Sequence, residues 1–328
     1  MRVARRILFF SLLVGAMGIA RADVPPGQLL DAVRGDLTNG NADHGLLALD
    51  QVLAQDPHNA EAHNLRCRIY LQEQRWSEAI KSCQLAVKLV PDNSNYHLWL
   101  ARALGEKADR VSFITAFKMA KQIHVEFETA AKLDPHNASA LSDLGEFYVD
   151  APGIVGGGID KAETVAQQLD AFAPDRAHYI RARIAENQKD YARAEEEYKA
   201  AIAAAKDPAD PWMDLASFYR KRQRYEDMIQ AVHKGAALDT EHGVASADGA
   251  SVLIRANRDL PFARQLLEQY LASSNKSEDA PAFQTHVALG KLLTSLGDPA
   301  DAQQQFVAAV ELAKDYQAGT QAATNSGR

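Results

Sequence analysis

The pentapeptide Asp-Pro-His-Asn-Ala occurs twice in this chain, at Asp56–Ala60 and again at Asp134–Ala138. Each copy separates two segments of helical periodicity, and a similar junction begins at Pro91, 34 residues after Pro57. A unit of this length that recurs along a chain is typical of helical solenoids, in which each unit stacks on its neighbours. We therefore expect an all-α fold built from antiparallel helix pairs.

One unit shows how the helix pairs are built. Its first helix is expected to begin at Ala60 and to run through Tyr70, and its second to extend from Trp76 to Leu89. Small side chains at fixed places in both helices would let the two helices approach closely. Large aromatic side chains between them would fill the remaining space.

This spacing of large and small residues resembles the tetratricopeptide repeat. The clearest copy contains Trp212, Leu215, Ala216 and Tyr219. The resemblance implies a right-handed superhelical solenoid of about eight repeats within residues 23–315, and such solenoids serve as surfaces that hold partners. The motif itself carries no chemistry.

The first 22 residues read as a secretory signal peptide. Three arginines precede an apolar run from Ile7 to Ala20, and the small-x-small pattern ending at Ala22 predicts cleavage after that residue. The alternative is a retained membrane anchor. Cleavage removes four arginines and no acids, which takes the net charge from −7 to −11. Such an acidic mature chain argues against nucleic acid as a partner, and we expect a periplasmic or secreted protein.

The C-terminal end of the chain differs in composition from the repeats. The final segment, residues 316–328, is rich in Gly, Ala, Thr, Ser and Asn, and we expect it to be disordered.

The only two cysteines, Cys67 and Cys83, fall on the two helices of one repeat. The repeat pattern places them opposite each other across the closest helix contact. In an exported protein such a pair is expected to form a disulfide. The alternative is two buried free thiols that act as small core residues.

Two repeats, residues 94–137 and 138–174, are longer than the others, and both insertions fall in the turn between the helices of a repeat. Turns of this kind lie along one edge of a solenoid, so the insertions should lie side by side, and insertions often mark a binding face. The second insertion is glycine-rich, and two interpretations remain open: a tight structural loop that folds over its neighbour, or a loop that binds a partner. A phosphate site is disfavoured, because the stretch lacks the Gly-Lys-Ser/Thr of a phosphate loop. The residues of this edge are Asp150, Pro152, Gly156, Gly157 and Gly158.

The concave surface is the second candidate site. The resemblance implies which positions line it, and these positions supply a mildly basic stripe inside an acidic protein. Such a stripe suits an acidic or carboxyl-ended peptide, although most charges of this kind are simply solvated. The candidate residues are Arg68, Arg102, Tyr179, Arg183, Arg220 and Lys221.

We find no catalytic motif, no metal site and no cofactor motif in the sequence. Four of the ten histidines, His63, His97, His178 and His286, recur at the same packing position of the repeat, which favours a structural role. The sequence therefore predicts a non-catalytic scaffold or adaptor of the cell envelope that binds another protein or peptide. The alternative is a small-ligand-binding accessory subunit of an envelope transporter, which would need a closed pocket at the inserted edge rather than an open groove.

Overall fold

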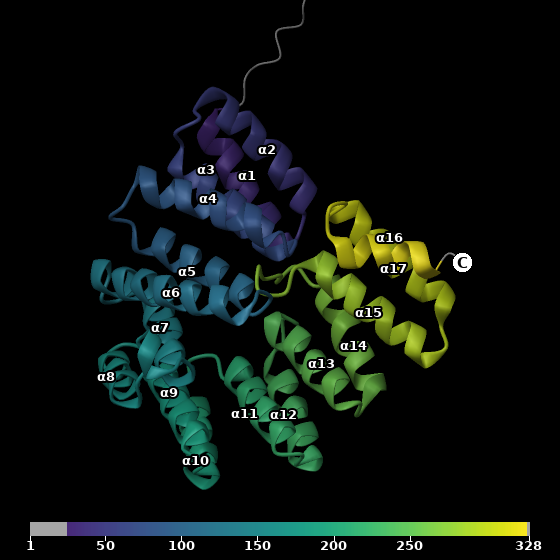
Figure 1. The fold of residues 1–328 in the computed structure, drawn as a ribbon. Helices are drawn as coiled ribbons and strands as arrows, with labels where there is room; N and C mark the ends of the chain where they lie inside the picture. The colour runs from purple at the N-terminus through teal and green to yellow at the C-terminus, as the bar shows by residue number, and fades with distance from the viewer. Residues whose placement is uncertain (1–24, 327–328) are drawn as a thin grey trace, which may run out of the picture.

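The computed structural model describes residues 25–326, and all regular structure in that range is helical (Figure 1). Sixteen α-helices form eight antiparallel pairs, which confirms the predicted solenoid of helix pairs. The first four pairs comprise α1 (Pro26–Asn39) with α2 (Ala42–Gln55), α3 (Ala60–Gln72) with α4 (Trp76–Leu89), α5 (Ser94–Ala108) with α6 (Phe113–Leu133), and α7 (Ala138–Asp150) with α8 (Ile159–Leu169). The last four comprise α9 (Pro174–Asn187) with α10 (Tyr191–Ala204), α11 (Ala209–Lys221) with α12 (Tyr225–Leu238), α13 (Val244–Ala256) with α14 (Leu260–Ala272), and α15 (Ala282–Leu296) with α16 (Pro299–Leu312).

The repeated junction sequence ends one helix and begins the next by two hydrogen bonds. In its first copy the Asp56 carboxylate accepts from the His58 amide (3.1 Å), which tightens the turn. The Asn59 side chain then accepts from the Ala62 amide (2.9 Å) and caps α3. The second copy repeats both bonds with its own Asp and Asn. The pentapeptide therefore recurs because each of its polar residues satisfies a backbone donor that the helix end leaves free.

The helices of a pair pack through small residues and are tied by the recurring histidines. Ala79, Ala86, Ala194 and Ala201 are almost wholly buried at these contacts. Of the four histidines, three bond a polar side chain of the following helix: His97 contacts Glu126, His178 contacts Glu197, and His286 contacts Gln305. The fourth, His63, bonds the Pro57 carbonyl oxygen. Their expected structural role is confirmed.

The disulfide between Cys67 and Cys83 is present and joins α3 to α4. Both residues are fully buried, so the bridge lies inside the helix pair rather than on its surface.

The superhelix closes on itself, which the sequence did not indicate. Helix α16 lies beside α2 in Figure 1, and side chains from both ends of the chain share one apolar core. Phe283 and Tyr316 from the C-terminal end pack there with Leu37 and Leu49 from the N-terminal end. The segment between α14 and α15 crosses to α3, where the Gln72 side chain donates to the Glu278 carbonyl oxygen (3.0 Å).

The C-terminal tail was expected to be disordered, but most of it is helical. Gln317–Ser326 forms helix α17, which packs on α15 and α16. The segment has few large apolar residues of its own, but Tyr316 is buried where the segment begins, and Gly319 lies close to Val287 and Ala309. The composition of the tail did not reveal this helix, because α16 supplies much of the apolar surface on which it packs.

The expected signal peptide and its cleavage site lie outside the described residues. Within the described range, no helix combines the length and the apolar character that crossing a bilayer requires.

Candidate functional site

The two insertions meet on one edge of the solenoid, as expected. The first lengthens α6 to 21 residues, whereas the second helices of most other repeats have 14. Ser112 occupies the N-cap position, but its hydroxyl group bonds the Thr115 hydroxyl group instead of a backbone amide. The second insertion contains a short 3-10 helix, η1 (Gly153–Val155), which packs against α6.

The glycine-rich segment forms a tight loop that leaves no room for a Cβ atom at two of its glycines. Gly156 has a φ of 111°, and a Cβ atom there would lie 2.4 Å from the His124 ring. A Cβ atom at Gly157 would lie 1.7 Å from the Ala151 carbonyl oxygen. The Gly158 amide donates to the Tyr148 carbonyl oxygen (2.8 Å) and leads directly into α8. The loop therefore folds back onto α6, which agrees with the first of the two interpretations.

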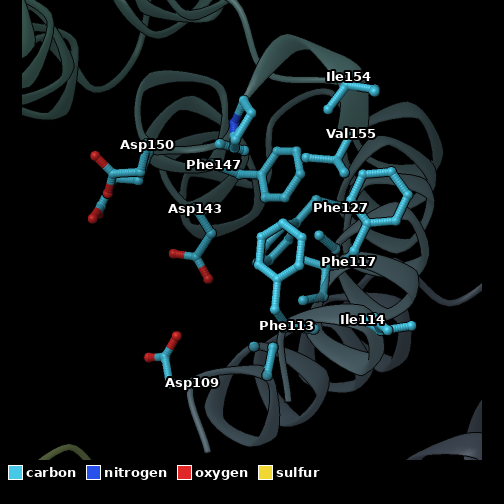
Figure 2. Close-up of a pocket in the computed structure, with 18 residues that line it drawn as sticks. Asp109, Phe113, Ile114, Phe117, Phe127, Asp143, Phe147, Asp150, Ile154 and Val155 are labelled. Carbon is cyan, nitrogen blue, oxygen red and sulfur yellow. The ribbon is translucent and has the colours of Figure 1, made fainter. Parts of the chain in front are cut away.

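Between the lengthened α6, α7 and this loop lies an apolar groove with a volume of about 970 Å³. Ile123, Phe127 and Val155 are buried at its floor. Phe113, Ile114 and Ile154 stand at its mouth and are 84%, 70% and 75% exposed. Figure 2 shows the aromatic and aliphatic side chains gathered on one side of the groove. The groove is therefore open along one side rather than enclosed.

Carboxylates form the opposite side of the groove. Asp109, Asp143 and Asp150 point away from the aromatic cluster in Figure 2, and Glu146 is a further lining residue of the groove. Burial raises the pKa of Glu146 above its usual range, and the Arg183 guanidinium partly offsets that effect. Two faces of opposite character, one apolar and one acidic, thus border a single groove.

Asp150 and Pro152, two of the expected edge residues, line this groove. Asp150 also accepts two hydrogen bonds from Arg183 (2.9 and 3.0 Å). The three glycines shape the loop instead of lining the groove. The structure therefore separates the expected edge set into groove residues and loop-forming residues.

Several of the arginines that were expected on the concave surface are engaged with acids of the same chain. Arg68 bonds Glu278 (2.6 Å), and Arg102 bonds Asp143 (2.6 Å). The guanidinium groups of both arginines lie less than 5 Å from the centre of the Trp99 ring. Because these guanidinium groups already have carboxylate partners, their positive charge is largely offset within the chain.

The remaining candidates divide in the same way. Arg183 donates to Glu146 (3.1 Å) and to the Tyr179 hydroxyl oxygen (3.2 Å) in addition to Asp150. Burial raises the pKa of Tyr179 well above its usual range, so its hydroxyl group stays protonated. Lys221 lies 3.4 Å from Glu186. These residues form one connected network that begins at the groove.

Arg220 is the exception. It lines a small inner cavity of about 210 Å³ together with Asp214, Asp248 and Arg255. Within residues 25–326, none of these four charged groups forms an ion pair or hydrogen bond, and the Arg220 Nε atom is buried without a partner. Burial, with nearby carboxylates, raises the pKa of Asp214 and of Asp248 to about 7 each.

Models described as tetratricopeptide repeat match residues 36–103, 155–234 in two overlapping copies, and 283–316. The chain contains tetratricopeptide repeats. Residues 104–154, which include the first insertion and the start of the second, lie in one of the stretches without a match.

Solved structures of two tetratricopeptide repeat proteins are similar to this chain. A thermophilic tetratricopeptide repeat protein from Thermus thermophilus is 18% identical, with a TM-score of 0.50, and the match covers 59% of this chain and 98% of that protein. A tetratricopeptide repeat protein from Parabacteroides merdae is 12% identical, with a TM-score of 0.42 and coverage of 92% and 99%. The likeness to the Thermus thermophilus protein concerns the fold alone. No curated protein matches the chain in sequence.

The sequence analysis did not identify the apolar side of the groove between α6, α7 and the glycine-rich loop. Phe113, Ile114, Phe127, Phe147, Ile154 and Val155 were not among the candidates. A signal was available, because two large apolar residues begin a helix that is longer than the repeat needs. Within the described residues, no three His, Cys, Asp or Glu side chains are grouped closely enough to hold a metal ion.

Proposed function

We propose that the chain is a non-catalytic scaffold or adaptor of the cell envelope that binds another protein or peptide. The observation that carries this proposal is the open apolar groove between α6, α7 and the glycine-rich loop. Large apolar side chains that remain exposed next to a groove are costly in water and mark interaction surfaces. Tetratricopeptide repeats are typically non-catalytic scaffolds, which agrees with such a surface.

The envelope location rests on the N-terminal sequence and on the cysteine pair. An apolar run after three arginines favours export, and a disulfide is stable in an oxidising compartment. Cell fractionation with N-terminal sequencing tests this part. We expect a periplasmic or secreted mature chain that begins at Asp23, and an intact chain in the cytosol would refute it.

Partner binding is tested by photo-crosslinking in cell extracts. A photoreactive residue at position 114 should trap a specific protein. The substitution Phe113→Asp should abolish this crosslink, because it places a charge at the mouth of the groove. The matched control is Leu47→Asp, which changes an apolar residue of α2 that is 60% exposed and distant from the groove. If the same partner is trapped equally by all three chains, the groove is not the binding surface.

The open groove argues against a small-ligand site at the inserted edge, but a cavity elsewhere favours the alternative of a small-ligand-binding subunit of an envelope transporter. The inner cavity at Arg220 places two arginines and two aspartates around a space of small-molecule size, without partners among the described residues. Calorimetry with a panel of free amino acids tests this alternative. Saturable heat that Arg220→Ala removes would support it, provided that no protein is trapped at position 114.

A further inference from the structure

The first two turns of α6 have an apolar face without a neighbour. Phe113, Phe117 and Ala120 follow one another at helical spacing and line the groove together. Phe127 lies on the same helix, yet it is only 8% exposed because the body of the repeat covers it. The uncovered part of α6 is therefore the part that the insertion added.

The acidic side of the groove carries an excess of negative charge. Four carboxylates line it, and none of its described lining residues is a lysine or arginine. Arg102 pairs with Asp143, and Arg183 is shared by Glu146 and Asp150. Asp109 has no ion pair within residues 25–326. On this side two guanidinium groups thus face four carboxylates, while the Lys121 ammonium group lies 4.9 Å from the centre of the Phe117 ring on the apolar side. The excess of negative charge favours a cationic neighbour.

The apolar wall restricts the backbone conformation of the occupant. An extended peptide would bury its amide and carbonyl groups against phenylalanine and isoleucine side chains, which offer no hydrogen bonds in return. The described chain also has no strand edge to which such a peptide could add. A helix satisfies its own backbone groups, and its apolar residues at every third or fourth position can enter a groove of this kind.

We propose that the groove binds an amphipathic helix of another protein, with apolar side chains along one face and lysine or arginine beside them. The apolar face lies on Phe113, Phe117 and Ile154, and the cationic flank lies along the carboxylates. This inference rests on the proposed function and specifies its partner.

Synthetic peptides test the chemistry of the partner directly. The probe is a peptide of about 18 residues, or five helical turns, with leucines along one face and lysines on the flank. A second peptide has glutamates in place of the lysines, and a third has a central proline that breaks the helix. Fluorescence anisotropy with the full chain should show at least tenfold tighter binding of the first peptide than of either other peptide. Equal binding of all three would overturn the proposal.

Variants of the chain then locate the contact. Phe113→Asp should reduce affinity for the cationic peptide at least tenfold, and Asp109→Lys should reduce it several-fold in low salt. Their matched controls, Leu47→Asp on α2 and Glu311→Lys on α16, change exposed residues outside the groove and should leave affinity unaltered. Loss of affinity in the controls as well would indicate non-specific attraction and would overturn the assignment.

Failure of the helix proposal can be told apart from failure of the proposed function. If Phe113→Asp abolishes the protein crosslink while no peptide binds, the scaffold function stands and the helical partner is wrong. If the purified chain forms dimers that Phe113→Asp dissolves, a second copy occupies the groove and the proposal is wrong. Binding of neutral lipid vesicles through Phe113 without preference for the cationic peptide would also refute it.

Discussion

Aromatic residues have different surroundings in the regular repeats and in the expanded edge, which is formed by the lengthened α6 and the glycine-rich loop. In the pair α11 and α12, the helices have 13 and 14 residues, and Phe218 is buried between neighbouring repeats. In the pair α5 and α6, the second helix continues for seven additional residues, and Phe113 is 84% exposed. A repeat thus buries its aromatic residues only while its helices match the length of the adjacent repeat. Extra turns create an uncovered apolar surface, which is available to a partner.

The largest effect should come from comparing two phenylalanines. Phe218→Ala should lower the free energy of unfolding by about 3–5 kcal/mol, because it leaves a cavity in a packed core. Phe113→Ala should change it by less than about 0.5 kcal/mol, because the side chain already faces water. Urea unfolding followed by circular dichroism measures both. Equal destabilisation would show that Phe113 is part of the core and that the edge is not distinct.

A second comparison concerns the covalent tie that only one helix pair possesses. The Cys67–Cys83 bridge closes a loop with a sequence separation of 16 residues. Replacing both cysteines by alanine should lower the free energy of unfolding by about 3 kcal/mol in the chain-entropy estimate. Thermal unfolding of the variant and of the reduced wild type should agree. If alkylation of the unreduced, unfolded wild type labels two cysteines per chain, the bridge does not form in the protein.

The sequence was a good guide to the regular repeats, because their spacing reports local packing directly. Asn59 and Asn137 cap helices that the repeated pentapeptide predicted, and the buried cysteines face each other as the repeat implied. The position of the two insertions also followed from spacing. What each insertion contacts did not follow, because the uncovered face of α6 depends on the length of the helices beside it.

Long-range contacts explain the remaining differences. Arg68 was expected to line the concave surface, and its partner Glu278 comes from a segment 210 residues away that crosses the closed superhelix. Phe283 and Tyr316 pack on each other in a core that they share with the N-terminal helices. A repeat pattern describes neighbouring units only, so closure of the superhelix is beyond it.

Two buried carboxylates of the regular repeats should make the stability of the fold depend on pH. Burial raises the pKa of Asp214 and Asp248 from 3.8 to about 7, so the folded state binds more protons than the unfolded state between these values. Stability should therefore decrease as the pH rises from about 4 to 7.

Removing the carboxylate of Asp214 should restore part of the stability that is lost at high pH. Asp214→Asn should raise the free energy of unfolding at pH 8 by about 2 kcal/mol and should have almost no effect near pH 3. Thermal melts across this pH range measure the difference, with Asp92→Asn, an exposed residue, as the control. A stabilisation that is independent of pH would mean that the carboxylate is not the cause.

Substitution of the loop glycines should have the clearest effect on the groove. Gly157→Ala places a methyl group against the Ala151 carbonyl oxygen, and Gly156→Ala places one against the His124 ring in a backbone conformation that favours glycine. Each should cost about 1 kcal/mol or more and should release the loop from α6. Gly153→Ala is the matched control, because nothing lies within 4 Å of the added methyl group. Hydrogen exchange should accelerate in residues 151–158 of the first two variants only, and crosslinking from position 114 should decrease with it. If crosslinking persists while the loop exchanges freely, the lengthened α6 alone provides the binding surface, and the expanded edge requires only one of its two insertions.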